Sequence, residues 1–177
     1  MAESNDPGTF LPGRKKELTI PAEEAWQVLS SPDVQYGFLG LHGLCEEGGF
    51  PYVVPMNFGA DPQADALYLH SANDPASKRC RAIGEDARVS FTVVDPASAI
   101  IPDAQGRPCK FSMRYRSVMV FGRIEAVATA EEKARLFNFL MQQKAPSARL
   151  DQVRPEDAEG ATVWKLRVEH VSGKRGG

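Results

Sequence analysis

A hydroxyl, an imidazole and two basic side chains lie close together near the middle of the chain, in Leu69-His70-Ser71 and Lys78-Arg79. Asp74-Pro75 between them predicts a helix start, because aspartate caps free N–H groups and proline suits the first turn. A strand that ends just before a helix N-terminus suits a phosphate, since the helix N–H groups and dipole point at the anion. Ser71 would add a hydroxyl, and Lys78 or Arg79 a positive charge. The alternative is an ordinary exposed basic helix.

His70 is the candidate for proton transfer, because imidazole exchanges a proton near neutral pH. The alternative is that His70 only fixes a strand end by hydrogen bonding. The other histidines, His42 and His170, have no comparable neighbours. No Cys/His pair or carboxylate cluster has the spacing of a metal site, and the sequence contains neither a G-x-G-x-x-G motif nor a P-loop.

The composition is that of one soluble globular domain. The chain has 177 residues, of which 42% are hydrophobic and 25% charged. We expect a flexible arm over residues 1–13 and a single domain over residues 14–177. No apolar run approaches the roughly 20 residues that span a bilayer, and the N-terminus does not resemble a signal peptide, so we expect a cytoplasmic protein without membrane partners. A net charge of −2 gives no reason to expect binding to nucleic acid.

The hydrophobic pattern predicts six strands and three short helices. The strands are expected over residues 38–44, 52–58, 66–70, 88–94, 111–127 and 163–171, and the helices over 21–30, 75–83 and 129–143. Pro55 suggests an edge or a bulge in the second strand. This order favours a mainly β protein, an antiparallel barrel with attached helices.

The stretch from Val118 to Phe121 is apolar on both faces of its predicted strand. A chain of this size cannot cover both faces itself, so one face would line the barrel and the other would meet a second copy. We therefore expect a homodimer.

Several segments, taken in order, resemble the FMN-binding split β-barrels of the pyridoxamine 5'-phosphate oxidase-like family. They are GFPYVVPMNFG, LYLHSANDPASKRCRAIGEDARVSFTVVD, CKFSMRYRSVMVFGRIE and the tail VEHVSGK. The Tyr-Leu-His and Tyr-x-Ser-Val pieces are similar to the nitroimidazole-resistance branch.

This resemblance implies an FMN site with contacts from several strands. One strand would lie along the flavin ring and bond its polar edge through the backbone of Val53, Val54, Pro55, Met56 and Asn57. Pro55 would mark where this strand leaves the ladder.

Elsewhere the resemblance implies contacts from Ser71 and Ser117, the latter often across a subunit interface, and places His70 beside the flavin or its substrate. The usual glycine before the basic residue is replaced by Asp74-Pro75-Ala76-Ser77, so the phosphate-binding cation, Lys78 or Arg79, stays open.

The expected function is an FMN-dependent oxidoreductase that reduces a small organic acceptor, with nitroaromatics among the candidates. Two alternatives share the fold: a protein that binds flavin or haem for sensing without turnover, and a deazaflavin-dependent reductase.

Overall fold

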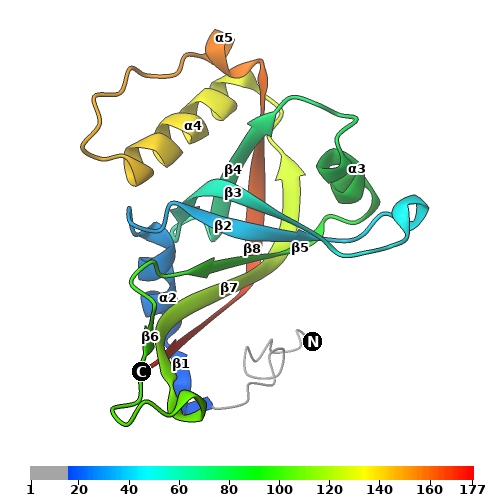
Figure 1. Ribbon diagram of the computed structural model, residues 1–177. Coiled ribbons are helices and arrows are strands. Elements are labelled where there is room, and N and C mark those ends of the chain that lie inside the picture. The colour runs from blue at the N-terminus through cyan, green and yellow to red at the C-terminus, as the bar shows by residue number, and fades with distance from the viewer. Residues whose placement is uncertain (1–15) are drawn as a thin grey trace, which may run out of the picture.

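The computed structural model describes residues 16–177 (Figure 1). The predicted flexible arm over residues 1–13 lies outside the described residues. None of the helices in the described part is long and apolar enough to cross a membrane.

Six antiparallel strands close into a barrel in the order β8-β4-β3-β2-β5-β7, and β7 returns to β8. This confirms the predicted mainly β, split-barrel fold. The strands are β2 (Tyr36–Leu41), β3 (Tyr52–Asp61), β4 (Ala66–Ala72), β5 (Arg88–Val94), β7 (Ser112–Ala126) and β8 (Ala161–Gly176). Two short strands lie outside the barrel: β1 (Thr19–Ile20) pairs with β8, and β6 (Ala99–Ile101) pairs with β7.

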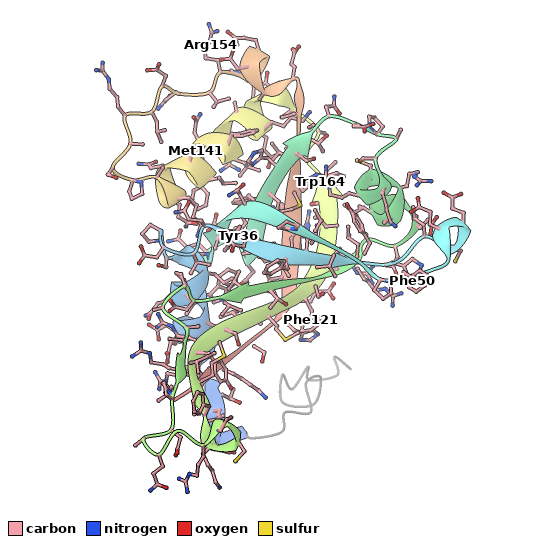
Figure 2. All side chains as sticks on the ribbon, viewed as in Figure 1. Tyr36, Phe50, Phe121, Met141, Arg154 and Trp164 are labelled. Atoms are coloured by element: carbon pink, nitrogen blue, oxygen red, sulfur yellow. The ribbon has the colours of Figure 1, made fainter. Side chains whose placement is uncertain are left out.

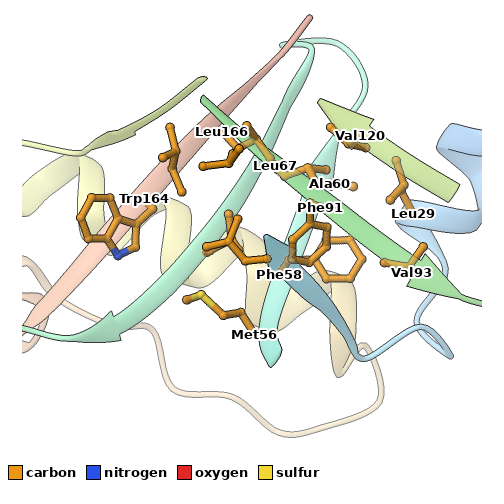
Figure 3. Packing of buried hydrophobic residues seen from close by; sticks show 14 of the residues in the cluster. Leu29, Met56, Phe58, Ala60, Leu67, Phe91, Val93, Val120, Trp164 and Leu166 are labelled. Atoms are coloured by element: carbon orange, nitrogen blue, oxygen red, sulfur yellow. The ribbon is translucent and has the colours of Figure 1, made fainter. Parts of the chain in front are cut away.

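Alternate residues of these strands fill the barrel interior. Phe58 and Phe91 are fully buried and meet edge to face, with ring centroids 4.9 Å apart. Figure 3 shows Met56, Leu67, Val120 and Leu166 around them. The neighbouring residues along each strand point outwards, because side chains alternate across a strand.

Three helices cover the barrel. Helix α2 (Ala22–Ser30) buries Ala25, Val28 and Leu29. Helix α3 (Lys78–Glu85) buries Ala82 and Ile83. Helix α4 (Ala130–Lys144) follows its N-cap Thr129, whose Oγ1 accepts a hydrogen bond from the Glu132 N–H, and it lies over the outside of β3 and β4. The remaining helices are α5 (Pro155–Ala158), η1 (Lys16–Leu18), η2 (Cys45–Glu47) and η3 (Pro108–Lys110).

Helix α3 begins three residues later than the sequence predicts. Ser77 is the N-cap and accepts a hydrogen bond from the Cys80 N–H, while the Asp74 carboxylate accepts one from the Ala76 N–H in a preceding turn. Two capping residues compete in this segment, and the later one begins the helix. Lys78 and Arg79 consequently lie in the first turn.

The prediction that β3 leaves its ladder at Pro55 is wrong on the β2 side. Pro55 pairs with Phe38, and the register continues without a shift to Tyr52. The ring of Pro55 is tolerated because this part of β3 has a strand neighbour on one side only.

Candidate functional site

Strands β3 and β4 separate halfway along their length. Their pairing runs from Asp61↔Ala66 to Phe58↔Leu69 and ends there. Residues 52–57 of β3 then pair only with β2, and residues 70–72 of β4 only with β8. We call this opening the β3–β4 split. It leaves backbone N–H and C=O groups of β3 without a ladder partner in the described chain, and such groups are strong hydrogen-bonding sites.

Helix α3 lies beside the β3–β4 split, between the end of β4 and the β2–β3 hairpin (Figure 1). The Lys78 ammonium group is 5.1 Å from the centre of the Tyr52 ring and 2.6 Å from Oε2 of Glu47 in the hairpin turn. Arg81 bonds both Glu46 and Glu47. The hydrogen bond from Lys78, together with Arg81, holds the pKa of Glu47 below its ordinary value. Two of the three cations of α3 are therefore already paired with carboxylates.

Arg79 is the third cation, and its surroundings differ. It precedes Ala82 and Ile83 by three and four residues, which places it on the inward face of the helix. Its Nε is buried and has no hydrogen-bond partner in residues 16–177. A buried charged donor without a partner costs free energy, so this atom favours an anionic ligand.

The predicted ring-contact residues of β3 divide between two faces. Val53, Pro55 and Asn57 are exposed on the outside of the barrel, whereas Met56 belongs to the core and Val54 packs against it. The Asn57 amide donates a hydrogen bond to the Gln35 carbonyl over 3.0 Å. Val54 and Met56 can meet a ligand in the split only through their backbone atoms, while Val53, Pro55 and Asn57 can also offer their side chains.

An exposed apolar surface continues from Val53 across the next strands. Phe38 pairs with Pro55 on one side and with Thr92 on the other, and Thr92 pairs with Met119. Cross-strand partners point to the same side of a sheet, so these side chains share one face. We call Phe38, Val53, Pro55, Thr92 and Met119 the outer face. Phe38 is 43% exposed, Val53 57% and Met119 41%.

Ser117 lies on β7 two residues from Met119, on the same side as the outer face. It is half-buried and pairs with Val94 and Lys174. The structure therefore brings Ser117 onto the same surface as Val53 and Pro55, although two strands, β2 and β5, lie between β3 and β7 in the sheet.

His70 and Ser71 point to opposite sides of β4. Ser71 faces the barrel interior, where its hydroxyl accepts a hydrogen bond from the Trp164 indole N–H over 3.1 Å and donates one to the Ala72 carbonyl. Trp164 is labelled in Figure 2. His70 faces outwards beneath α4, with its ring centroid 4.6 Å from that of Phe137. The structure does not bring these two side chains together, because neighbours in a strand alternate.

The environment of His70 keeps the imidazole neutral at pH 7. Burial lowers the pKa of His70 below its ordinary value of 6.5. Its Nδ1 is buried and has no hydrogen-bond partner in the described chain. On the same face of β4, Tyr68 donates a hydrogen bond to Asp61, and burial raises the pKa of Tyr68 to about 12.

Comparison with known proteins identifies the family. A family model described as pyridoxamine 5'-phosphate oxidase matches residues 21–175. The chain belongs to this family. The predicted resemblance is thereby confirmed. No curated protein matches the chain significantly.

Solved structures of similar fold include a proposed 5-nitroimidazole antibiotic resistance protein from Bacteroides thetaiotaomicron. It is 25% identical, has a TM-score of 0.71, and the match covers 89% of this chain and 86% of that one. The flavocytochrome Anf3 from Azotobacter vinelandii is 21% identical with a TM-score of 0.73, covering 93% and 72% of the two chains. An FAD and heme binding protein from Mycobacterium smegmatis is 21% identical with a TM-score of 0.68, covering 88% and 71%.

In this member of the pyridoxamine 5'-phosphate oxidase family, sequence reasoning missed the partners that surround the predicted residues. Glu46 and Glu47, in the turn before β3, form ion pairs with Lys78 and Arg81. Two acids in one turn and three cations in one short helix are complementary, and that signal was available in the sequence. The bond from Trp164 to Ser71 and the contact of Phe137 with His70 had no comparable sequence signal, because they depend on strand pairing and helix packing.

Among the described residues 16–177, no group of three or more His, Cys, Asp or Glu side chains is arranged to hold a metal ion. The candidate site of this pyridoxamine 5'-phosphate oxidase family member is thus an opening with backbone hydrogen-bonding groups at one edge, a neutral histidine nearby and an unpaired guanidinium atom. Such a site suits an organic ligand that carries both a polar ring and an anion.

Proposed function

We propose that the chain binds FMN in the β3–β4 split and acts as a flavin-dependent oxidoreductase on a small organic acceptor. The observation that carries this proposal is the unpaired edge of β3 over residues 52–57 beside the partnerless Nε of Arg79. A flavin ring with a polar edge and a phosphate at the end of its side chain needs both features. The three structural neighbours above, a proposed 5-nitroimidazole resistance protein, a flavocytochrome and an FAD and heme binding protein, support the same class.

The backbone of residues 53–57 would hold the polar edge of the ring. Every second residue of a strand directs its N–H and C=O towards the free side, and β4 does not occupy that side here. Pro55 has no N–H and can only accept. The neighbouring Asn57 amide is held by the Gln35 carbonyl, which fixes this side chain at the rim of the split.

Arg79 is the residue that we assign to the phosphate. Lys78 is committed to Glu47, whereas the Arg79 guanidinium has a buried donor without a partner. The free N–H groups at the start of α3 would also donate hydrogen bonds to the phosphate, because the Ser77 side chain caps only the Cys80 N–H. Ser71 would contribute less than expected, because its hydroxyl already bonds Trp164 and Ala72.

When bound, FMN supplies the electron-transfer chemistry. His70 would hold or move a proton at an atom of the acceptor. Its pKa is lowered, so the ring is neutral at pH 7 and can both donate from one nitrogen and accept at the other. Its Nδ1 has no hydrogen-bond partner in the described chain, so this nitrogen would be the one that meets the acceptor.

We also propose that the protein is a homodimer in which the outer face is covered. Val118 and Val120 fill the barrel, while Met119 is exposed on the opposite side of the same strand. With Phe38 and Val53 it forms an apolar surface of the kind that marks a protein interface. Ser117 borders this surface, so a second copy would bring it close to the partner's split.

A flavin- and haem-binding protein without rapid turnover is the second candidate. It is favoured by two of the structural neighbours, a flavocytochrome and an FAD and heme binding protein. The absorption spectrum of the purified protein, before and after addition of FMN, separates the two candidates. A flavin spectrum with reduction of a nitroaromatic by a chemical or pyridine-nucleotide donor supports the first. A Soret band supports the second, and a protein that binds neither contradicts both.

A further inference from the structure

A second cavity lies at the end of the barrel where β5 ends and β7 begins. It has a volume of about 200 Å³, and its polar lining comes from Asp95, Ser98, Arg114, Tyr115, Arg116 and Arg175. Such a volume holds several water molecules, and is therefore large enough for a small oxyanion. None of these residues belongs to the β3–β4 split or to α3.

Two of the three arginines in this cavity are held in place by carboxylates. Arg116 donates two hydrogen bonds to Oδ2 of Asp95, over 3.0 Å and 2.6 Å. Arg175 donates one to Oε1 of Glu24 over 2.9 Å. Pairing of this kind orients a guanidinium group, whose remaining donors stay available to another anion.

Arg114 has no acidic partner among residues 16–177. Among the side chains of this cluster, three guanidinium groups therefore face two carboxylates. The hydroxyl of Ser98 is buried in the same wall and has no hydrogen-bond partner in the described chain. A buried polar group without a partner is uncommon and indicates an absent ligand or water.

The backbone keeps this cavity open. Gly176 and Gly177 form part of its lining, and a Cβ atom on Gly177 would lie 2.6 Å from the Cα of Arg114. Gly177 also has a φ of +99°, which side-chain-bearing residues rarely adopt. Glycine at this position thus allows close approach to Arg114 without filling the cavity.

We propose that this cavity is a binding site for a small oxyanion, either a carboxylate or a phosphate group, separate from the flavin site. Arg114 supplies the charge, Arg116 and Arg175 supply oriented N–H donors, and the Ser98 hydroxyl completes the set. Guanidinium groups match the paired oxygens of both ligand classes. Arg114 and Arg116 lie three residues and one residue before Ser117 on β7. Because side chains alternate along a strand, these two arginines point to the opposite side from Ser117 and the outer face.

The test is isothermal titration calorimetry of the full chain with inorganic phosphate and, separately, with acetate at constant ionic strength. We expect one saturable site per chain for at least one probe, and the tighter probe identifies the class. Arg114→Gln should weaken that binding about tenfold to hundredfold, the usual effect of a charge-assisted hydrogen bond. Arg149→Gln is the matched control, because Arg149 is exposed on a loop outside this cavity, and its affinity should equal that of the wild type.

Ser98→Ala gives a second readout that a purely structural hydroxyl would not give. It should weaken anion binding severalfold, yet leave the melting temperature of the anion-free protein unchanged or higher, since the hydroxyl is unpartnered there. No saturable binding of either probe, or equal affinities of Arg114→Gln and Arg149→Gln, overturns the proposal. Loss of phosphate binding once the protein is saturated with FMN would show that the two sites are one, and would overturn it as well.

Discussion

The ammonium group of Lys78 and Oε2 of Glu47 lie 2.6 Å apart, and this pair decides which cation of α3 is available to a ligand. Arg79, its neighbour in sequence, has no such partner in residues 16–177. The two residues can therefore be separated by experiment.

Arg79→Gln should weaken FMN binding about tenfold to hundredfold, while riboflavin, which lacks the phosphate, binds as tightly as before. Lys78→Ala should also affect FMN more than riboflavin if it reaches the phosphate, but less than Arg79→Gln, because Lys78 must first leave Glu47. Quenching of flavin fluorescence measures all four affinities. Glu47→Gln is the control, since it frees Lys78 and should not weaken FMN. Equal losses for both flavins would contradict a phosphate role for either cation.

His70→Asn tests the proton-transfer role, because asparagine keeps some hydrogen bonding and cannot titrate near neutral pH. We expect the variant to keep its flavin and its fold while the rate of acceptor reduction falls about a hundredfold, the usual scale of general acid–base catalysis. The rate is measured by stopped-flow reoxidation of the reduced flavin. A variant that loses flavin but turns over normally when loaded would make His70 a cofactor contact. Unchanged binding with an unchanged rate would leave it a structural residue.

The buried Lys144 should make the free energy of unfolding depend on pH in the alkaline range. Its Nζ donates to the carbonyls of Leu29 and Ser31, and burial lowers its pKa from 10.5 to about 8. Between these values the unfolded chain binds more protons than the folded one, so the free energy of unfolding should rise with pH, by on the order of 1–3 kcal/mol. Urea unfolding of the wild type and of Lys144→Met between pH 7.5 and pH 10 measures the difference. Parallel pH profiles for the two proteins would show that Lys144 stays charged.

Met119→Asp tests the dimer. Met119 is 41% exposed on the outer face, so the single chain tolerates the charge, whereas a covered interface does not. Light scattering at micromolar concentration should give a dimer mass for the wild type and a monomer mass for the variant. Leu150→Asp is the matched control, since Leu150 is 42% exposed and lies elsewhere, on the connection after α4. A monomeric wild type with flavin bound would refute the dimer.

Strand β5 matches its predicted bounds because short-range signals agree there: a charged start, alternating apolar residues and an Asp-Pro stop after Val94. Strand β8 extends five residues beyond the prediction, to Gly176, although Ser-Gly-Lys-Arg-Gly is poor strand sequence. This end of β8 pairs with β1 on one side and with β7 on the other, and that pairing stabilises the strand although its residues have low strand propensity.

In the candidate site, too, the features that local residue types decide could be predicted, and those that depend on strand pairing and packing could not. The strand end at His70 and Ser71 and the basic start of α3 could be recognised from residue types alone. The sides to which His70 and Ser71 point could not, because alternation tells only that neighbours differ. Which residue faces the core depends on the pairing of Ser71 with Thr162 and on where Trp164 and Phe137 lie. When two neighbouring polar residues lie at the end of a strand, a sequence-based prediction should therefore assign only one of them to a given ligand, because their side chains point to opposite sides.

The long strand β8 has a consequence for how the protein is made. It pairs with β1, β4 and β7, and it is the last of the barrel strands in the chain. During synthesis β4 and β7 leave the ribosome well before β8, with one edge each unpaired and the apolar interior incomplete. Closure waits for the pairing of β8 with β4, whose residues lie about half the chain apart, and such long-range pairing is a slow kind of folding step. The nascent chain thus passes through an open-edged state in which chaperones compete with aggregation.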